Sequence, residues 1–128
     1  MADHAPRVLV VEDDPVSRLV AVRMLQRLGC AVRTAVSGAE AIAWVARERF
    51  DLILMDCRLP DIDGLAATRV IRKGPRGGIP IVAVTAGTGS EERAGCLAAG
   101  MNDFLDKPIS LDALAAAVAR WTGAPVCA

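Results

Sequence analysis

The chain has 128 residues, a length that fits one domain built around one hydrophobic core. Fifteen Lys and Arg balance fifteen Asp and Glu, so the composition gives no sign of a general affinity for nucleic acid. The hydrophobic fraction of 53% excludes a disordered chain, and the 3% aromatic residues are too few and scattered for a platform that stacks nucleic-acid bases.

Short apolar segments alternate along the chain with patterns that are typical of helices. Strands are predicted over residues 7–11, 31–35, 51–56, 79–84 and 102–106. Helices are predicted over residues 15–28, 37–49, 63–73, 90–99 and 110–121, with Pro15 at a first helical position and Ser37 and Asp63 as N-caps. Five such pairs predict a doubly wound α/β domain with a five-stranded parallel sheet and five helices. Ligands of this architecture bind beyond the carboxyl ends of the strands.

Polar side chains follow four of the predicted strands. Glu12 and Asp13 come after the first strand, Asp56 after the third, Thr85 after the fourth and Lys107 after the fifth. Carboxylates that are brought together repel one another, and a bound cation with oxygen ligands relieves that repulsion. Mg²⁺ fits best, because it takes one or two carboxylates, keeps waters and accepts phosphate oxygens. These residue types therefore predict a phosphoryl-transfer site with Asp56 as the nucleophile.

The motifs that contain these residues resemble the receiver domain of two-component response regulators. They are LVVED at residues 9–13, LILMDCRLP at 52–60 with Asp63-Gly64, VTA at 84–86 and KP at 107–108. The resemblance covers about residues 6 to 121 and is specific, because every motif stands at the expected strand end in the expected order. It implies a flavodoxin-like sheet with the strand order 2-1-3-4-5.

The resemblance also implies roles for the acidic residues. Glu12 and Asp13 would hold Mg²⁺ together with Asp56 and the backbone carbonyl of Arg58. Asp56 would accept a phosphoryl group from a phosphohistidine on a histidine kinase or a histidine phosphotransfer protein. The domain would assist this transfer and its own later dephosphorylation, as a switch rather than a conventional enzyme.

The remaining motif residues would act on the phosphoryl group and respond to it. Thr85 and Lys107 would stabilise the phosphoryl oxygens, and Pro108 is a proline that the family often holds in a cis peptide. Thr85 and Phe104 would form the conformational switch. Phe104 lacks the hydroxyl of relatives with Tyr at this position, and Gly87 has no side chain to position a water, so the lifetime of the phosphoryl group is left open.

We expect a single receiver domain over residues 1–128, whose output passes through protein contacts and includes homodimerisation on phosphorylation as one option. Residues 102–109 resemble receivers that are attached to hybrid histidine kinases. Val16 and Leu19 point away from the core face of the first helix, which is formed by Ala21, Met24, Leu25 and Leu28. They are predicted to dock the helix that carries the donor histidine.

Three other functions are weighed against this one. The stretch TAGTGS at residues 85–90 looks like a phosphate-binding loop and suggests a flavodoxin-like FMN binder. Flavodoxins carry that loop after the first strand, where this chain has the acids 12–14 that would repel a phosphate. A haloacid dehalogenase-like phosphatase requires a second acid that residues 56–58 lack, and a receiver that acts only as a scaffold is a third alternative.

The sequence also bears on compartment and redox chemistry. No apolar run approaches the roughly 18 residues of a membrane span, and acids appear before a signal peptide could form, so we expect a cytoplasmic protein without membrane insertion. Cys30, Cys57, Cys96 and Cys127 are widely spaced, and His4 cannot complete a zinc site with them. Buried, reduced thiols are therefore expected.

Overall fold

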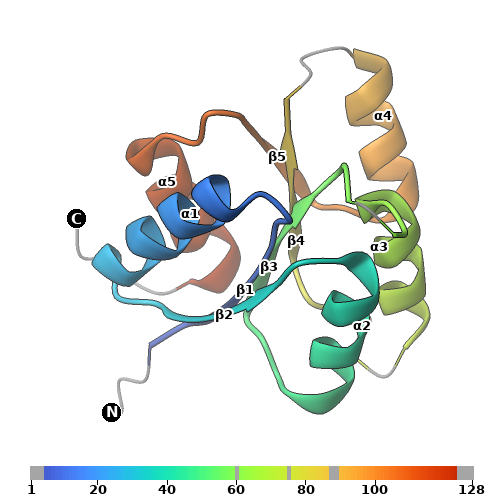
Figure 1. The fold of residues 1–128 in the computed structure, drawn as a ribbon, viewed down its shortest axis with the longest axis horizontal. Helices are drawn as coiled ribbons and strands as arrows, with labels where there is room; N and C mark the ends of the chain where they lie inside the picture. The colour runs from blue at the N-terminus through green and yellow to red at the C-terminus, as the bar shows by residue number, and fades with distance from the viewer. Residues whose placement is uncertain (1–4, 60, 75, 87–89, 124–128) are drawn as a thin grey trace.

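The computed structural model describes residues 5–59, 61–74, 76–86 and 90–123, in which strands and helices alternate as expected (Figure 1). The strands are β1 (Arg7–Val11), β2 (Ala31–Ala35), β3 (Leu52–Asp56), β4 (Ile81–Thr85) and β5 (Asp103–Asp106). The helices are α1 (Pro15–Arg27), α2 (Gly38–Arg47), α3 (Gly64–Lys73), α4 (Ser90–Ala99) and α5 (Leu111–Thr122). Among the residues that the sequence analysis names, His4, Pro60, Cys127 and residues 87–89 of the loop 85–90 lie outside the described residues.

All strand pairs are parallel, and the sheet order is β2-β1-β3-β4-β5. This confirms the doubly wound, flavodoxin-like order expected from the resemblance. Strands β3 and β4 are buried along their whole length, because helices cover both faces of the sheet. The carboxyl ends of β1, β3, β4 and β5 therefore meet at one edge, where the polar residues of the motifs lie.

Alternate side chains of each strand point into two separate cores. On one face Leu25 of α1 and Leu114 of α5 pack against Val10, Leu54 and other strand residues. On the other face α2, α3 and α4 cover side chains such as Ile53 and Ile81 (Figure 1). Because these apolar side chains are buried, the two cores hold the central strands, and the residues at their ends, in fixed positions.

Side-chain caps begin the helices where the sequence predicts them. Pro15 is the first residue of α1, and the N-cap Asp14 accepts a hydrogen bond from the Ser17 N–H at 2.8 Å. Ser37 and Asp63 cap α2 and α3 in the same way. The β1–α1 and β3–α3 loops are thus anchored immediately beside the carboxyl edge of the sheet.

Several predicted boundaries are wrong by one or two residues. The fourth strand begins at Ile81 rather than at residue 79, since Pro80 has no N–H to donate to a ladder. The second helix ends at Arg47 rather than near Arg49, because Glu48 adopts an extended conformation and its carboxylate accepts a hydrogen bond from the Arg7 guanidinium. Neither difference moves a residue of the predicted site.

The described cysteines Cys30, Cys57 and Cys96 are free and buried, as expected. The wide spacing in the sequence does not reveal that the Sγ atoms of Cys57 and Cys96 lie 3.5 Å apart. Burial, followed by the neighbouring Cys96, raises the pKa of the Cys57 thiol. Within the described ranges, none of the helices has the length and apolar character needed to cross a membrane.

Candidate functional site

Three carboxylates converge at the carboxyl edge of the sheet, as the strand-end residues predict. Each of Glu12, Asp13 and Asp56 offers an oxygen within 4.8 Å of the other two. The adjacency of β1 and β3 produces this cluster, because Glu12 directly follows β1 and Asp56 is the last residue of β3. Glu12 and Asp56 are buried, whereas Asp13 is exposed at the mouth of the site.

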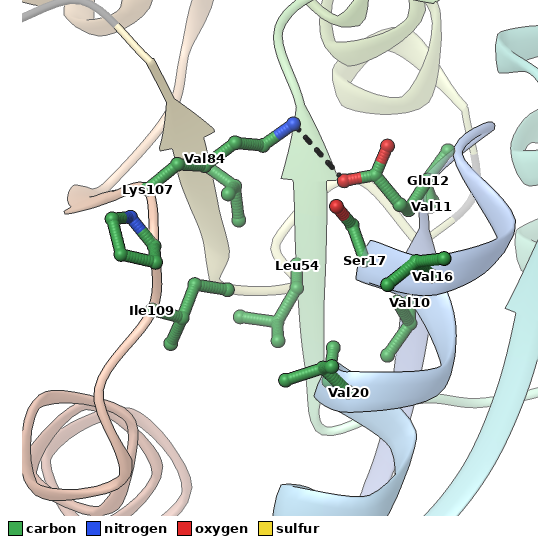
Figure 2. A pocket seen from close by; sticks show the side chains of 12 residues that line it. Val10, Val11, Glu12, Val16, Ser17, Val20, Leu54, Val84, Lys107 and Ile109 are labelled. Atoms are coloured by element: carbon green, nitrogen blue, oxygen red, sulfur yellow. Dashed lines mark ion pairs between the residues drawn. The ribbon is translucent and has the colours of Figure 1, made fainter.

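One ammonium group reaches two of these carboxylates. Lys107 Nζ lies 3.1 Å from Glu12 Oε1 and 3.1 Å from Asp56 Oδ2; Figure 2 shows the pair with Glu12. Burial alone would lower the pKa of Lys107, but its hydrogen bonds to Asp56 and Glu12 outweigh burial and raise it. Lys107 therefore stays charged and oriented toward Asp56. The Lys107–Pro108 peptide bond is cis, as the resemblance implies.

Burial and the neighbouring carboxylate of the cluster perturb the pKa of Glu12. Burial raises the pKa of Glu12 from its ordinary 4.5 to about 7, and the nearby Asp56 adds to the increase. The Asp14 N–H, which donates to Glu12 Oε2 at 3.2 Å, and Lys107 oppose the increase without cancelling it. A hard divalent cation fits this donor set, because two buried and one exposed carboxylate carry more negative charge than Lys107 neutralises.

The β3–α3 loop positions Asp56 through its backbone. The Arg58 N–H donates to Asp56 Oδ1 at 3.0 Å, and the Gly64 N–H donates to the Cys57 carbonyl at 3.1 Å. A Cβ atom at residue 64 would lie 2.2 Å from the backbone oxygen of Asp56, so only glycine allows this close approach. The Arg58 side chain is exposed, and the role of its carbonyl as a metal contact stays a prediction.

Thr85 and Phe104 lie on the two strands next to β3. Thr85 is buried at the end of β4, one residue beyond Val84, the register partner of Asp56. Its hydroxyl donates to Asp106 Oδ1 at 3.4 Å, across the β4–β5 ladder. The half-buried Phe104 ring has the Arg93 guanidinium over it, with Cζ 5.1 Å from the ring centroid.

Sequence reasoning missed the contacts that Asp106 and Arg93 make with these two residues. Asp106 is the register partner of Thr85, and Arg93 comes from α4, so only the assembled sheet brings the four side chains together. The one signal in the sequence for these contacts is Asp106, the acid directly before Lys107. An acid at this position is equally typical of an exposed residue at a strand end.

A groove of about 340 Å³ extends from the carboxylate cluster between α1 and the segment that joins β5 to α5. In Figure 2, Val16 and Val20 of α1 face Ile109 across it, and the Glu12–Lys107 pair closes one end. Val16 is 71% exposed and Val20 is 44% exposed, which leaves an open apolar wall beside the acidic site.

Leu19 is 53% exposed, as predicted, but it is not among the residues that line this groove. The sequence thus identified Val16 correctly as an exposed residue near the site and missed Val20. The periodicity of α1 gives the direction of a side chain only approximately, and the position of residue 109 opposite the helix is not readable from it.

A comparison with family models finds that residues 8–119 match the response regulator receiver domain. The sensor protein GacS of Pseudomonas syringae pv. syringae is 40% identical over 127 residues, and hybrid signal transduction histidine kinase A of Dictyostelium discoideum is 36% identical over 125 residues. The matches cover 96% and 94% of this chain but 14% and 6% of those proteins, so the chain spans a small part of their length.

Solved structures with the same fold include two that bear on the site. One is the receiver domain of the sensor histidine kinase PA1611 of Pseudomonas aeruginosa PAO1 with magnesium coordinated in its active-site cleft, at TM-score 0.88, 44% identity and coverage of 94% of this chain and 99% of that chain. Another is the receiver domain of Ssk1 in complex with the phosphotransfer protein Ypd1 of Saccharomyces cerevisiae, at TM-score 0.87, 27% identity and coverage of 96% and 92%.

The family match extends over most of the chain and includes the carboxylate cluster, Thr85 and Lys107. The sheet order and the convergence of these residues at its carboxyl edge agree with that match. This chain therefore belongs to the response regulator receiver domain family.

Proposed function

We propose that this receiver domain takes a phosphoryl group from a phosphohistidine onto Asp56, with Mg²⁺ bound by Glu12, Asp13 and Asp56. The observation that carries the proposal is the position of Asp56: a buried carboxylate with one oxygen on Lys107 and two acidic neighbours within 4.8 Å. The related PA1611 receiver domain, which is described with magnesium in its cleft, supports the choice of metal. When bound, Mg²⁺ would neutralise charge on the carboxylates and on the arriving phosphoryl oxygens.

In the transfer, a carboxylate oxygen of Asp56 forms a bond to phosphorus while the bond from phosphorus to the donor imidazole nitrogen breaks. The electron pair of that bond stays on the imidazole, which then takes up a proton. Lys107 holds Asp56 in place through its 3.1 Å contact and then donates to a phosphoryl oxygen. The Thr85 hydroxyl is the second proposed donor, and its reorientation would couple the phosphoryl group to Phe104.

The groove beside the cluster is the proposed docking site for the donor helix. Its wall of Val16 and Val20 lies directly next to Glu12, so a helix seated there would hold its histidine close to Asp56. The complex of the Ssk1 receiver with Ypd1 supports a histidine phosphotransfer protein as the partner, and the hybrid histidine kinases among the relatives support a histidine kinase as the alternative. Leu19, exposed on the same helix, is proposed to extend this contact.

The fate of the aspartyl phosphate and the extent of the receiver unit are finer parts of the proposal. We propose that water hydrolyses the aspartyl phosphate in the same site, and that residues 1–128 act as one receiver unit without nucleic-acid contact. Homodimerisation on phosphorylation and a cytoplasmic location stay predictions. An FMN site is disfavoured, because the acids after β1 occupy the position where a flavodoxin would bind phosphate.

The proposal is tested by incubating the protein with acetyl phosphate, with and without Mg²⁺, and measuring its intact mass. We expect the mass of one phosphoryl group to be added with Mg²⁺ and not in EDTA. Lys107→Ala should slow the addition strongly, whereas Arg120→Ala, a change of an exposed residue on α5, should not affect it. Lack of any addition in the wild type with Mg²⁺ would favour a scaffold instead, and copurified FMN would favour the flavodoxin-like alternative.

A further inference from the structure

Asp106 connects the Thr85 side chain to helix α4. One of its oxygens, Oδ1, accepts a hydrogen bond from the Thr85 hydroxyl at 3.4 Å. Both of its oxygens lie near Arg93 Nη2, at 3.4 Å and 3.3 Å. The carboxylate therefore stands between the end of β4 and α4, and it links the two through side chains alone.

Arg93 in turn connects this carboxylate to Phe104. Its guanidinium carbon lies 5.1 Å from the centre of the Phe104 ring, a distance at which a cation is attracted to the ring face. Its Nε is buried and is the one buried side-chain nitrogen or oxygen in the described part of the chain with no hydrogen-bond partner. Arg93 thus leaves one donor unsatisfied while it holds this position, which makes the arrangement easy to release.

We propose that Asp106 and Arg93 form a latch that holds Thr85 and Phe104 in the arrangement of the unphosphorylated domain. The inference rests on the proposed function, because it assigns a regulation to the same site. The Thr85 hydroxyl has one hydrogen to donate. While it donates to a phosphoryl oxygen on Asp56 it cannot also donate to Asp106, so the phosphoryl group competes with the latch for this hydrogen.

Loss of the Thr85–Asp106 hydrogen bond would affect Phe104 through the ion pair of Asp106 with Arg93. When the hydroxyl turns away, Asp106 loses a contact that holds its carboxylate in front of Arg93. Arg93 is then free to leave the Phe104 ring and to satisfy its Nε in solvent. Asp106 and Arg93 are positioning residues in this scheme, since neither touches the phosphoryl group.

The latch biases the switch without blocking it. The side chains of Arg93 and Asp106 are 41% and 48% exposed, and an ion pair in such a setting shifts an equilibrium by no more than about fivefold. Removing the latch should therefore tighten the binding of a phosphoryl mimic by about three- to fivefold. It should leave the affinity for Mg²⁺ alone unchanged, because the carboxylate cluster does not contact Arg93 or Asp106.

The test is a calorimetric titration with Mg²⁺ alone and with beryllofluoride in saturating Mg²⁺. The variants are Asp106→Ala, Arg93→Ala and the double change. Arg120→Ala is the matched control, because Arg120 also pairs with an acid of β5, Asp103, and also lies over a ring, that of Trp121, at the opposite end of the strand. Both single variants should bind beryllofluoride more tightly, and the double variant no more tightly than the better single one.

NMR spectra of the Phe104 ring distinguish the latch from a purely structural role of Asp106 and Arg93. The chain has only two phenylalanines, so the ring signals of Phe104 are readily assigned by NMR. In Asp106→Ala without ligand, they should move toward the positions that beryllofluoride produces in the wild type.

Unchanged beryllofluoride affinity in both single variants, an equal gain in Arg120→Ala, or fully additive gains would each overturn the latch. So would Phe104 signals that stay in place in Asp106→Ala. If the wild type itself failed to bind beryllofluoride in Mg²⁺, this result would contradict both the proposed function and the latch. Normal binding by the wild type with unaltered variants contradicts the latch alone.

Discussion

Replacing Glu12 with glutamine should remove a pH-dependent loss of folding stability from the metal-free protein. The folded state binds a proton at Glu12 more tightly than the unfolded chain, because burial raises the pKa of this carboxyl from 4.5 to about 7. The free energy of unfolding therefore falls as the pH rises through this interval and stays low above it. In Glu12→Gln this contribution is absent, while the amide can still accept the Asp14 N–H.

The magnitude follows from the size of the pKa change. Raising the pKa from 4.5 to about 7 corresponds to an upper value of about 3 to 4 kcal/mol, at about 1.4 kcal/mol for each pH unit. Solvent reaches the site through Asp13 and the open groove, and the resulting screening reduces the expected cost to about 1 to 2 kcal/mol. The stabilisation of Glu12→Gln over the wild type should thus be near zero at about pH 3.5 and should reach this value at about pH 8.

Urea denaturation in EDTA at several pH values measures this difference. His4, the one histidine of the chain, is present in both proteins, so any contribution from it cancels in the comparison. Glu40→Gln is the matched control, because Glu40 is an exposed glutamate on α2 that does not belong to the cluster. If the free energies of unfolding of the wild type and Glu12→Gln depended on pH in the same way, the view that folding raises the pKa of Glu12 would be refuted.

Three further outcomes are expected. Asp13→Ala should abolish the rise in melting temperature that Mg²⁺ gives the wild type, as measured by differential scanning calorimetry; an equal rise in both would contradict metal binding by Asp13. Val16→Asp and Leu19→Ala should slow phosphotransfer from a histidine phosphotransfer protein and leave labelling by acetyl phosphate nearly unchanged, and equal slowing with both donors would count against docking on α1. Gly64→Ala should cost about 1 to 3 kcal/mol in urea denaturation and slow phosphorylation, because its Cβ would press on the Asp56 backbone; a stable, fully active variant would disprove the need for that close approach.

Strand ends and helix caps are the features that local sequence predicts best here. The acids that follow β1 and β3, the lysine before Pro108 and the caps Ser37 and Asp63 all stand where their residue types predict. Each depends on the chain within a few residues and on the general geometry of parallel sheets. The order of the sheet came from the resemblance and not from composition or periodicity.

Contacts between elements are the features that the sequence did not reveal. The approach of Arg93 to Asp106, of Cys57 to Cys96 and of Val20 to the groove depends on strand register and on how α4 and α1 sit on the sheet. The pattern of apolar and polar residues along the chain does not determine which residue of a helix lies beside which residue of a strand. Side chains from distant segments therefore had to be located in the assembled structure.

The most direct test of the proposed phosphotransfer is to identify the residue that carries the phosphoryl group. The protein is phosphorylated with acetyl phosphate and Mg²⁺, the acyl phosphate is reduced with borohydride, and the modified residue is located by peptide mass spectrometry. Modification of Asp56 alone is expected in the wild type, and none in Asp56→Asn, which should remain folded. Modification of Glu12 or Asp13 in the wild type, or labelling that persists in Asp56→Asn, would contradict the assignment of Asp56 as the phosphoryl acceptor.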